Sequence, residues 1–185
     1  PVKKLIQDIK LDKGINILDA GDEMAILRKA FESLSGEIEK NKMSMMQNHL
    51  NSLLKGRFMY QADNFAQIDF PYEYFFCVAM SIDKYDEFAG KYEVKRQYYL
   101  KMIILNIAEQ IIGSGCNCTG VNMENGEMAL IINLEAMPTG MAQNQFRESF
   151  YKIQKETAKI FDYTISIGIG RCYKDIFEIS TSYIE

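Results

Sequence analysis

The 185-residue sequence contains no tryptophan, only three prolines and a single histidine, His49. His49 lies in a helix-like segment far from Ser81 and Ser166, the serines that it would have to activate in a hydrolase. A Ser-His-Asp constellation is therefore not indicated. No run of eighteen apolar residues occurs, so no membrane-spanning helix is predicted, and no signal peptide is visible.

Cysteine is also scarce, at Cys77, Cys116, Cys118 and Cys172. The sequence has no C-x-x-C pair, and a structural zinc site needs about four cysteine or histidine ligands. We therefore predict no metal and no cofactor. The thiols are expected to be reduced and packed as small apolar groups.

The formal net charge of −4 is unevenly distributed along the chain. Residues 1–60 hold ten Lys/Arg and eight Asp/Glu, a net charge of +2, whereas residues 61–185 hold eleven and seventeen, a net charge of −6. An acidic surface repels phosphate backbones, so this chain is not expected to bind DNA or RNA directly.

The first 56 residues have the periodicity of helices. A short amphipathic helix is predicted over residues 2–10, followed by a break at Gly14 and a longer helix from about residue 22. Apolar residues of the longer helix follow the 3-4-3-4 spacing of a coiled-coil seam. The predicted seam comprises Met24, Leu27, Phe31, Leu34 and Ile38.

A second apolar series, Met43, Met46, Leu50 and Leu53, has the same rhythm but is out of phase with the first. Such a phase change joins two helical packings in one rod. The alternative is an amphipathic helix that lies on a globular core. In both interpretations the helix is expected to end near Gly56.

From residue 74 onward the pattern changes to alternating strands and helices. An apolar strand is predicted over residues 74–80, a helix over 91–112 and a helix over 141–160. The expected inward-facing residues of the two helices are Val94, Tyr98, Met102, Leu105 and Ile112, and Phe146, Phe150, Ile153 and Ile160.

Between these helices, residues 116–123 and 127–134 are predicted to form a hairpin around Asn125-Gly126, a strong turn signal. A strand over 163–169 and a helix over 174–185 complete the order β-α-β-β-α-β-α. We therefore predict an α+β fold with a ferredoxin-like sheet covered by helices.

The N-terminal segment resembles a HAMP module over residues 1–40. The resemblance depends on Pro1, on the connector at Gly14, and on Asp22-Glu23 at the start of the heptad helix. HAMP modules relay movement through a parallel dimeric four-helix bundle. The resemblance implies that Pro1 and Glu23 are relay points and that residues Leu27, Phe31, Leu34 and Ile38 form the dimer seam.

The C-terminal segment resembles the GGDEF-type nucleotide-cyclase fold. Residues 80–85 are similar to the D-x-D-x-F segment of that family, residues 124–128 occupy the place of its signature hairpin, and residues 164–170 are similar to its late strand. Active members hold Mg²⁺ with carboxylates and use it to orient a nucleoside triphosphate.

At the two positions of the metal carboxylates, the resemblance places Ser81 and Gly126. Glu124 and Asn125 replace the two glycines beside which the phosphates would lie, and Glu124 adds a negative charge there. These replacements predict that the catalytic site is degenerate.

Two acids remain, Asp83 and Glu127. A shift of the hairpin alignment by one residue would place Glu127 at a metal position. The alternatives are therefore a divergent diguanylate or nucleotide cyclase, or a sensory domain that binds nucleotides without catalysis.

The whole chain resembles the membrane-anchored AraC-type transcriptional regulators of Gram-positive bacteria, to which the soluble YesN-like response regulators are related. This implies a HAMP-like relay (1–40), a connecting coiled-coil helix (41–56) and a degenerate GGDEF-like domain (57–185), with sensor and DNA-binding domains outside the chain. The expected function is non-catalytic signal transmission in the cytoplasm by a parallel homodimer through residues 22–55.

Overall fold

The computed structural model describes residues 42–57, 70–113 and 116–185. The predicted HAMP-like helices and the heptad seam of residues 24–38 lie outside these ranges. Residues Met46–Glu185 form one compact unit.

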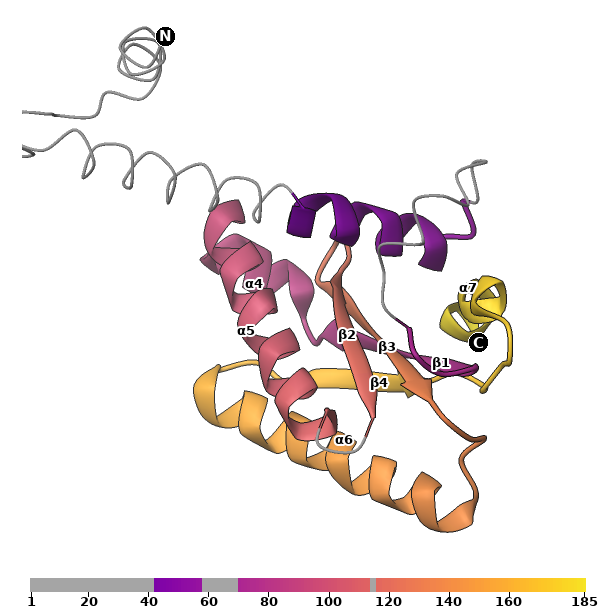
Figure 1. Ribbon diagram of the computed structural model, residues 1–185. Coiled ribbons are helices and arrows are strands. Elements are labelled where there is room, and N and C mark those ends of the chain that lie inside the picture. Colours follow the sequence, from indigo (N-terminus) through magenta and orange to yellow (C-terminus); the bar gives the residue numbers. More distant parts are fainter. Residues whose placement is uncertain (1–41, 58–69, 114–115) are drawn as a thin grey trace, which may run out of the picture. The chain divides into compact units, whose positions relative to one another are not determined.

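One antiparallel sheet of four strands forms the centre of this unit, in the order β2-β3-β1-β4 (Figure 1). The strands are β1 (Tyr74–Ile82), β2 (Asn117–Asn122), β3 (Glu127–Leu134) and β4 (Ile165–Ile169). β1 pairs with β3 on one side and with β4 on the other. The predicted α+β class and the antiparallel hairpin are confirmed.

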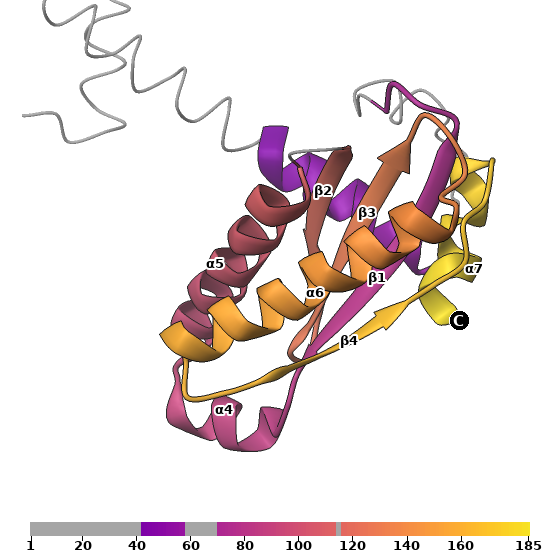
Figure 2. The same cartoon turned by 90° about the horizontal axis from the view of Figure 1, so that it is seen from below.

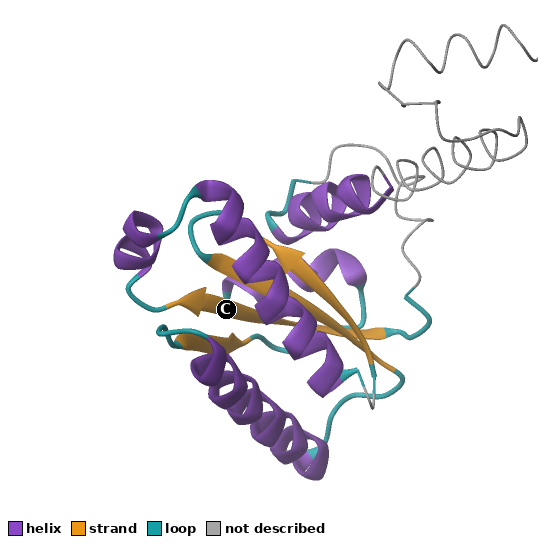
Figure 3. Ribbon diagram, turned by 90° about the vertical axis from the view of Figure 1, so that its left-hand side faces the viewer, coloured by secondary structure: helices purple, strands orange, loops and turns teal. Residues whose placement is uncertain are grey.

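Helices cover both faces of the sheet. Figure 2 shows α5 (Val94–Ile112) and α6 (Gly140–Ile160) across one face. The other face carries α7 (Ile179–Ile184) and residues 46–54 of the helix over 42–54, which is named the entry helix below. Figure 3 shows the strands in orange between these helices. β1 is therefore buried from both sides, as its continuous apolar run predicted.

The β2–β3 hairpin has the turn that its sequence predicted. Asn125 and Gly126 have φ angles of 48° and 77°, so both central residues are left-handed, as a type I′ turn requires. The amide of Glu127 donates to the carbonyl of Glu124 over 2.9 Å and closes the turn, and the amide of Met123 donates to the carbonyl of Glu127 over 3.1 Å.

The prediction for α5 was wrong in two respects. The helix starts at Val94, because residues Tyr85–Lys91 form a separate helix, α4. Val94 and Tyr98, predicted to face inward, are 82% and 50% exposed. Apolar side chains occur on more than one side of α5, so their periodicity does not define the buried side. The buried residues are Lys101, Ile104, Leu105, Ala108 and Ile112, so Leu105 and Ile112 of the predicted set do face inward, and Met102 packs against the same core.

In α6, Phe150 and Ile153 are buried and Phe146 packs against the same core, as predicted. Ile160 was expected to face inward but is 56% exposed, because it is the last residue of the helix. The segment predicted as one helix over 174–185 is a 3₁₀ turn, η1 (Ile176–Glu178), followed by α7.

The entry helix ends at residue 54, and Gly56 follows with a φ of 64°. The amide of Gly56 donates to the carbonyl of Leu53, and that of Arg57 to the carbonyl of Ser52. This pair of bonds is the Schellman motif with glycine at its left-handed position. The predicted end of the helix is therefore confirmed.

The apolar series that was assigned to a coiled-coil seam packs instead on the sheet of its own chain. Leu50, Leu53 and Leu54 have no exposed surface, and Met46 packs against the same cluster. For residues 46–54, the alternative of an amphipathic helix on a globular core is correct. None of the helices that the structure describes is long and apolar enough to cross a membrane.

Candidate functional site

The predicted site residues from β1 and from the hairpin meet at one end of the sheet. Ser81 is the register partner of Glu127 on β3 and of Ser166 on β4. The amide of Ile82 donates to the carbonyl of Gly126 over 3.1 Å. The antiparallel pairing therefore brings together the segments that the sequence singled out as a degenerate cyclase site.

The side chain of Asp83 is hydrogen-bonded to Ser166 of β4 and to Thr164, the residue directly before that strand. Its carboxylate accepts hydrogen bonds from the hydroxyl of Thr164 and, over 2.7 Å, from that of Ser166. These two bonds lower the pKa of Asp83 because they favour the charged form. The carboxylate is thus occupied by protein donors.

Glu127 bonds to the C-terminal helix. The hydroxyl of Tyr183 on α7 donates to its Oε2 over 3.0 Å. Burial raises the pKa of the Tyr183 hydroxyl, and the bond to Glu127 raises it further, so this hydroxyl keeps its proton as a donor. The acid that the shifted alignment would make a metal ligand therefore connects the hairpin to α7.

The space beside the hairpin turn is filled by an aromatic ring. A Cβ atom at Gly126 would overlap the ring of Tyr85 on α4. The Tyr85 hydroxyl donates to Oε1 of Gln97 over 3.0 Å, and Nε2 of Gln97 donates to the carbonyl of Tyr92 over 2.7 Å. Glycine at 126 is thus required by packing within the chain as well as by its left-handed backbone.

A buried lysine under the hairpin was missed by the sequence reasoning. Lys101 is 7% exposed, and its Nζ donates to the carbonyl of Met123 over 2.5 Å. Burial lowers its pKa, while the charges of Glu127 and Glu124 act in the opposite direction. The sequence contains a signal for this burial. Lys101 lies three and four residues before the apolar pair Ile104 and Leu105, and therefore on the same side of the helix.

These side chains do not fit a magnesium-triphosphate site. Ser81 and Gly126 supply no carboxylate, and Asp83 and Glu127 are bound to protein hydroxyls. Over residues 42–57, 70–113 and 116–185, no group of three or more His, Cys, Asp or Glu side chains is arranged to hold a metal ion. Glu124 lies 3.2 Å from Nζ of Lys55, next to the entry helix.

The entry helix is fixed to the edge of the sheet by two side-chain amides. Gln47 donates to the carbonyl of Gly120 over 2.8 Å and accepts from the amide of Asn122 over 3.1 Å. Asn51 donates to the carbonyl of Asn122 over 3.1 Å. These bonds satisfy outer-edge backbone groups of Gly120 and Asn122, so this part of β2 is not open to another strand.

The C-terminal helix is fixed to the central strand by one hydroxyl. Ser182 accepts from the amide of Cys77 over 2.9 Å and donates to the carbonyl of Arg171 over 2.7 Å. A Cβ atom at Gly170 would overlap the backbone of Ser182, so the close approach of α7 requires glycine there.

The site geometry thus links three segments, the hairpin, the entry helix and α7, through paired polar groups.

Comparison with known proteins finds no matching family model, no matching curated protein and no matching solved structure.

We expect the Thr164→Val variant to be less stable than the wild type by about 0.5–1 kcal/mol at neutral pH, since a partly exposed charged hydrogen bond is lost. The folded-state pKa of Asp83 is lowered. Its contribution is therefore present above its unfolded pKa of about 3.9 and lost as the pH falls through the folded value. Urea unfolding at a series of pH values measures this difference.

The control is the same substitution in an Asp83→Asn background, where its effect should not depend on pH. A difference between wild type and Thr164→Val that persists unchanged at acidic pH would show that Asp83 is not stabilised by this hydroxyl.

Proposed function

We propose that the chain is a non-catalytic signal-transmission module of a bacterial AraC-type transcriptional regulator. Its sheet would be a ferredoxin-like, nucleotide-cyclase (GGDEF)-type domain whose catalytic site has been lost. It would relay a sensor input to a DNA-binding domain outside this chain. The βαββαβ order and the strand order β2-β3-β1-β4 support this assignment of the domain.

The observation that carries the proposal is a core shared by the entry helix and α7, which is named the exit helix below. Leu50, Leu53 and Leu54 are buried in one cluster with Ile179 of α7, on one face of the sheet. At the end of the entry helix, a Cβ atom at Gly56 would lie 3.8 Å from the side chain of Ser180. The two segments that lead into and out of the domain therefore share a packed face.

Close packing gives this arrangement a mechanical consequence. Each fully buried leucine contributes about 1.5–3 kcal/mol, so the entry helix cannot leave the sheet without a large cost. It can shift only if Ile179 and its neighbours repack, because cores at this density do not deform continuously. A displacement that arrives at residue 46 would thus change the position or the stability of α7.

The same proposal includes a membrane-anchored parent protein, with this chain in the cytoplasm and a parallel dimer formed through the predicted seam. Residues 46–54 are not available to that dimer in the described packing, because the sheet covers their apolar side. Contacts between copies would therefore fall on Leu27, Phe31, Leu34 and Ile38, with Pro1 and Glu23 as relay points.

We expect Leu53→Ala to speed hydrogen exchange of the α7 amides more than that of the α6 amides, because the cavity lies in the core that α7 shares. Leu105→Ala is the matched control, since Leu105 of α5 is equally buried but belongs to the core on the other face of the sheet, which α5 shares with α6. Both changes cost about 2–5 kcal/mol. Hydrogen exchange is followed by mass spectrometry under conditions where global unfolding is rare. This measurement distinguishes the local effects of the two variants on α7 and α6. Equal acceleration of α7 in both variants would contradict the relay.

The cyclase alternative makes a different prediction. With GTP and Mg²⁺ we expect no turnover, and no rise in the melting temperature at millimolar nucleotide, because a ligand that binds the folded state would stabilise it. Asp83→Ala is the matched variant. Turnover that falls in Asp83→Ala would establish an enzyme, and a thermal shift without turnover would establish a nucleotide sensor.

A further inference from the structure

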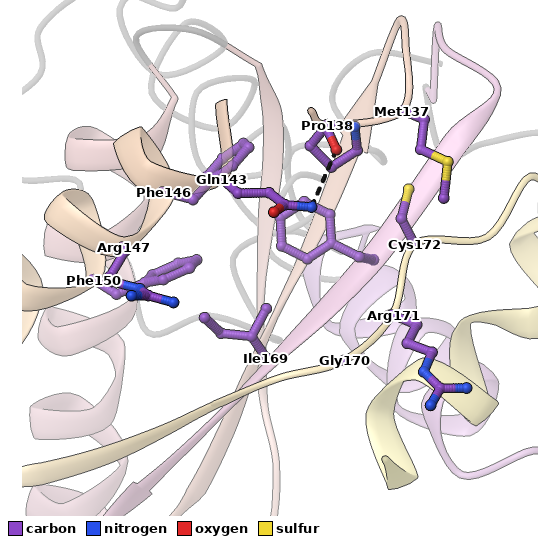
Figure 4. A pocket seen from close by; sticks show the side chains of 11 residues that line it. Met137, Pro138, Gln143, Phe146, Arg147, Phe150, Ile169, Gly170, Arg171 and Cys172 are labelled. Atoms are coloured by element: carbon purple, nitrogen blue, oxygen red, sulfur yellow. Dashed lines mark hydrogen bonds between the residues drawn. The ribbon is translucent and has the colours of Figure 1, made fainter. Parts of the chain in front are cut away.

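A cavity of about 450 Å³ lies between the first half of α6, the end of β4 and the segment that leads to α7 (Figure 4). Its volume is in the range of small-molecule sites. It is on the face of the sheet opposite to the shared core, and none of the candidate cyclase residues lines it. The cavity is therefore separate from the candidate cyclase residues.

Aromatic rings form much of its wall. Phe76 of β1 and Phe146 of α6 meet edge to face with centroids 5.2 Å apart, and Phe146 stacks on Phe150 at 6.1 Å. Met137 and Ile169, which are 59% and 54% exposed, flank the opening. Such walls favour a flat apolar body, which can stack on one ring and meet the edge of another.

Two arginines line the cavity in an otherwise acidic domain. Figure 4 shows Arg147 beside Phe150 and Arg171 at the opposite side. Arg147 has no ion-pair partner within the described part of the chain, whereas Nη1 of Arg171 lies 3.7 Å from Glu185. A guanidinium without a carboxylate partner, next to apolar walls, matches the anionic group of an amphipathic ligand.

The segment 170–172 connects this cavity to the exit helix. The carbonyl of Arg171 accepts the Ser182 hydroxyl, and its amide donates to Oε2 of Glu185 over 3.2 Å. An anion near Arg171 would compete with Glu185 for the guanidinium. The contact of Glu185, the residue after α7, with this segment would then weaken.

We infer that this cavity binds a small organic anion with a flat apolar body, such as an aromatic carboxylate or sulfonate, and that binding loosens α7. The inference that a ligand binds depends only on the cavity. The inference that this ligand acts as a signal rests on the proposed relay function. The site therefore adds a second route by which α7 can be controlled, from the face opposite to the entry helix.

The test uses 8-anilinonaphthalene-1-sulfonate as the probe and its uncharged counterpart N-phenyl-1-naphthylamine as the comparison, titrated by fluorescence into the full chain. We expect one saturable sulfonate site that Arg147→Gln weakens by about tenfold or more, since a charge-assisted contact is lost. Arg147→Lys should restore part of the affinity. Arg96→Gln on α5, outside the cavity, should leave it unchanged, and the uncharged probe should not distinguish the variants.

Hydrogen exchange of α7 with and without the sulfonate tests the coupling. Faster exchange in the presence of the probe, reproduced without probe in Glu185→Gln, supports the inference. Sulfonate binding that is unaffected by Arg147→Gln, no binding at millimolar probe, or binding without any change in α7 would each overturn it. The Leu53→Ala comparison is independent of these results, so failure here is distinguishable from failure of the relay.

Discussion

β1 is the strand on which both halves of the domain depend, since it is central in the sheet and carries a core on each face. Phe76, Val78 and Met80 face α5 and α6, whereas Phe75 and Cys77 face the entry helix and α7. A sheet with two buried faces needs cover on both. The second cover is supplied jointly by helices from the two ends of the domain, and this joint cover is the basis of the proposed relay.

The polar groups at the end of the sheet have structural partners in the chain. Asp83 is bound by hydroxyls at β4, Glu127 by Tyr183, and the carbonyl of Met123 by Lys101. Buried or partly buried polar groups are costly unless they are paired. This pairing gives both acids a structural role within the chain, and Glu127 connects the hairpin to α7.

The sequence predicted correctly the features that depend on local backbone conformation. It did not predict the features that depend on contacts between residues far apart in the chain. The Asn125-Gly126 turn and the helix end at Gly56 follow from backbone conformations that few residues other than glycine and asparagine adopt. The buried side of α5 does not follow from local pattern, because the sheet selects among several apolar sides. The grouping of Ser81 with the hairpin was predictable, whereas the roles of Tyr85, Lys101 and Tyr183 depend on tertiary packing.

The most direct measurement of the central claim is a double-mutant cycle between Leu54→Ala and Ile179→Ala, followed by urea unfolding. Residues that share a core interact, so the two losses in unfolding free energy should differ from additivity by about 0.5 kcal/mol or more. The cycle between Leu105→Ala and Ile179→Ala, on opposite faces, should be additive. Additivity in the first cycle would contradict the shared core and with it the relay.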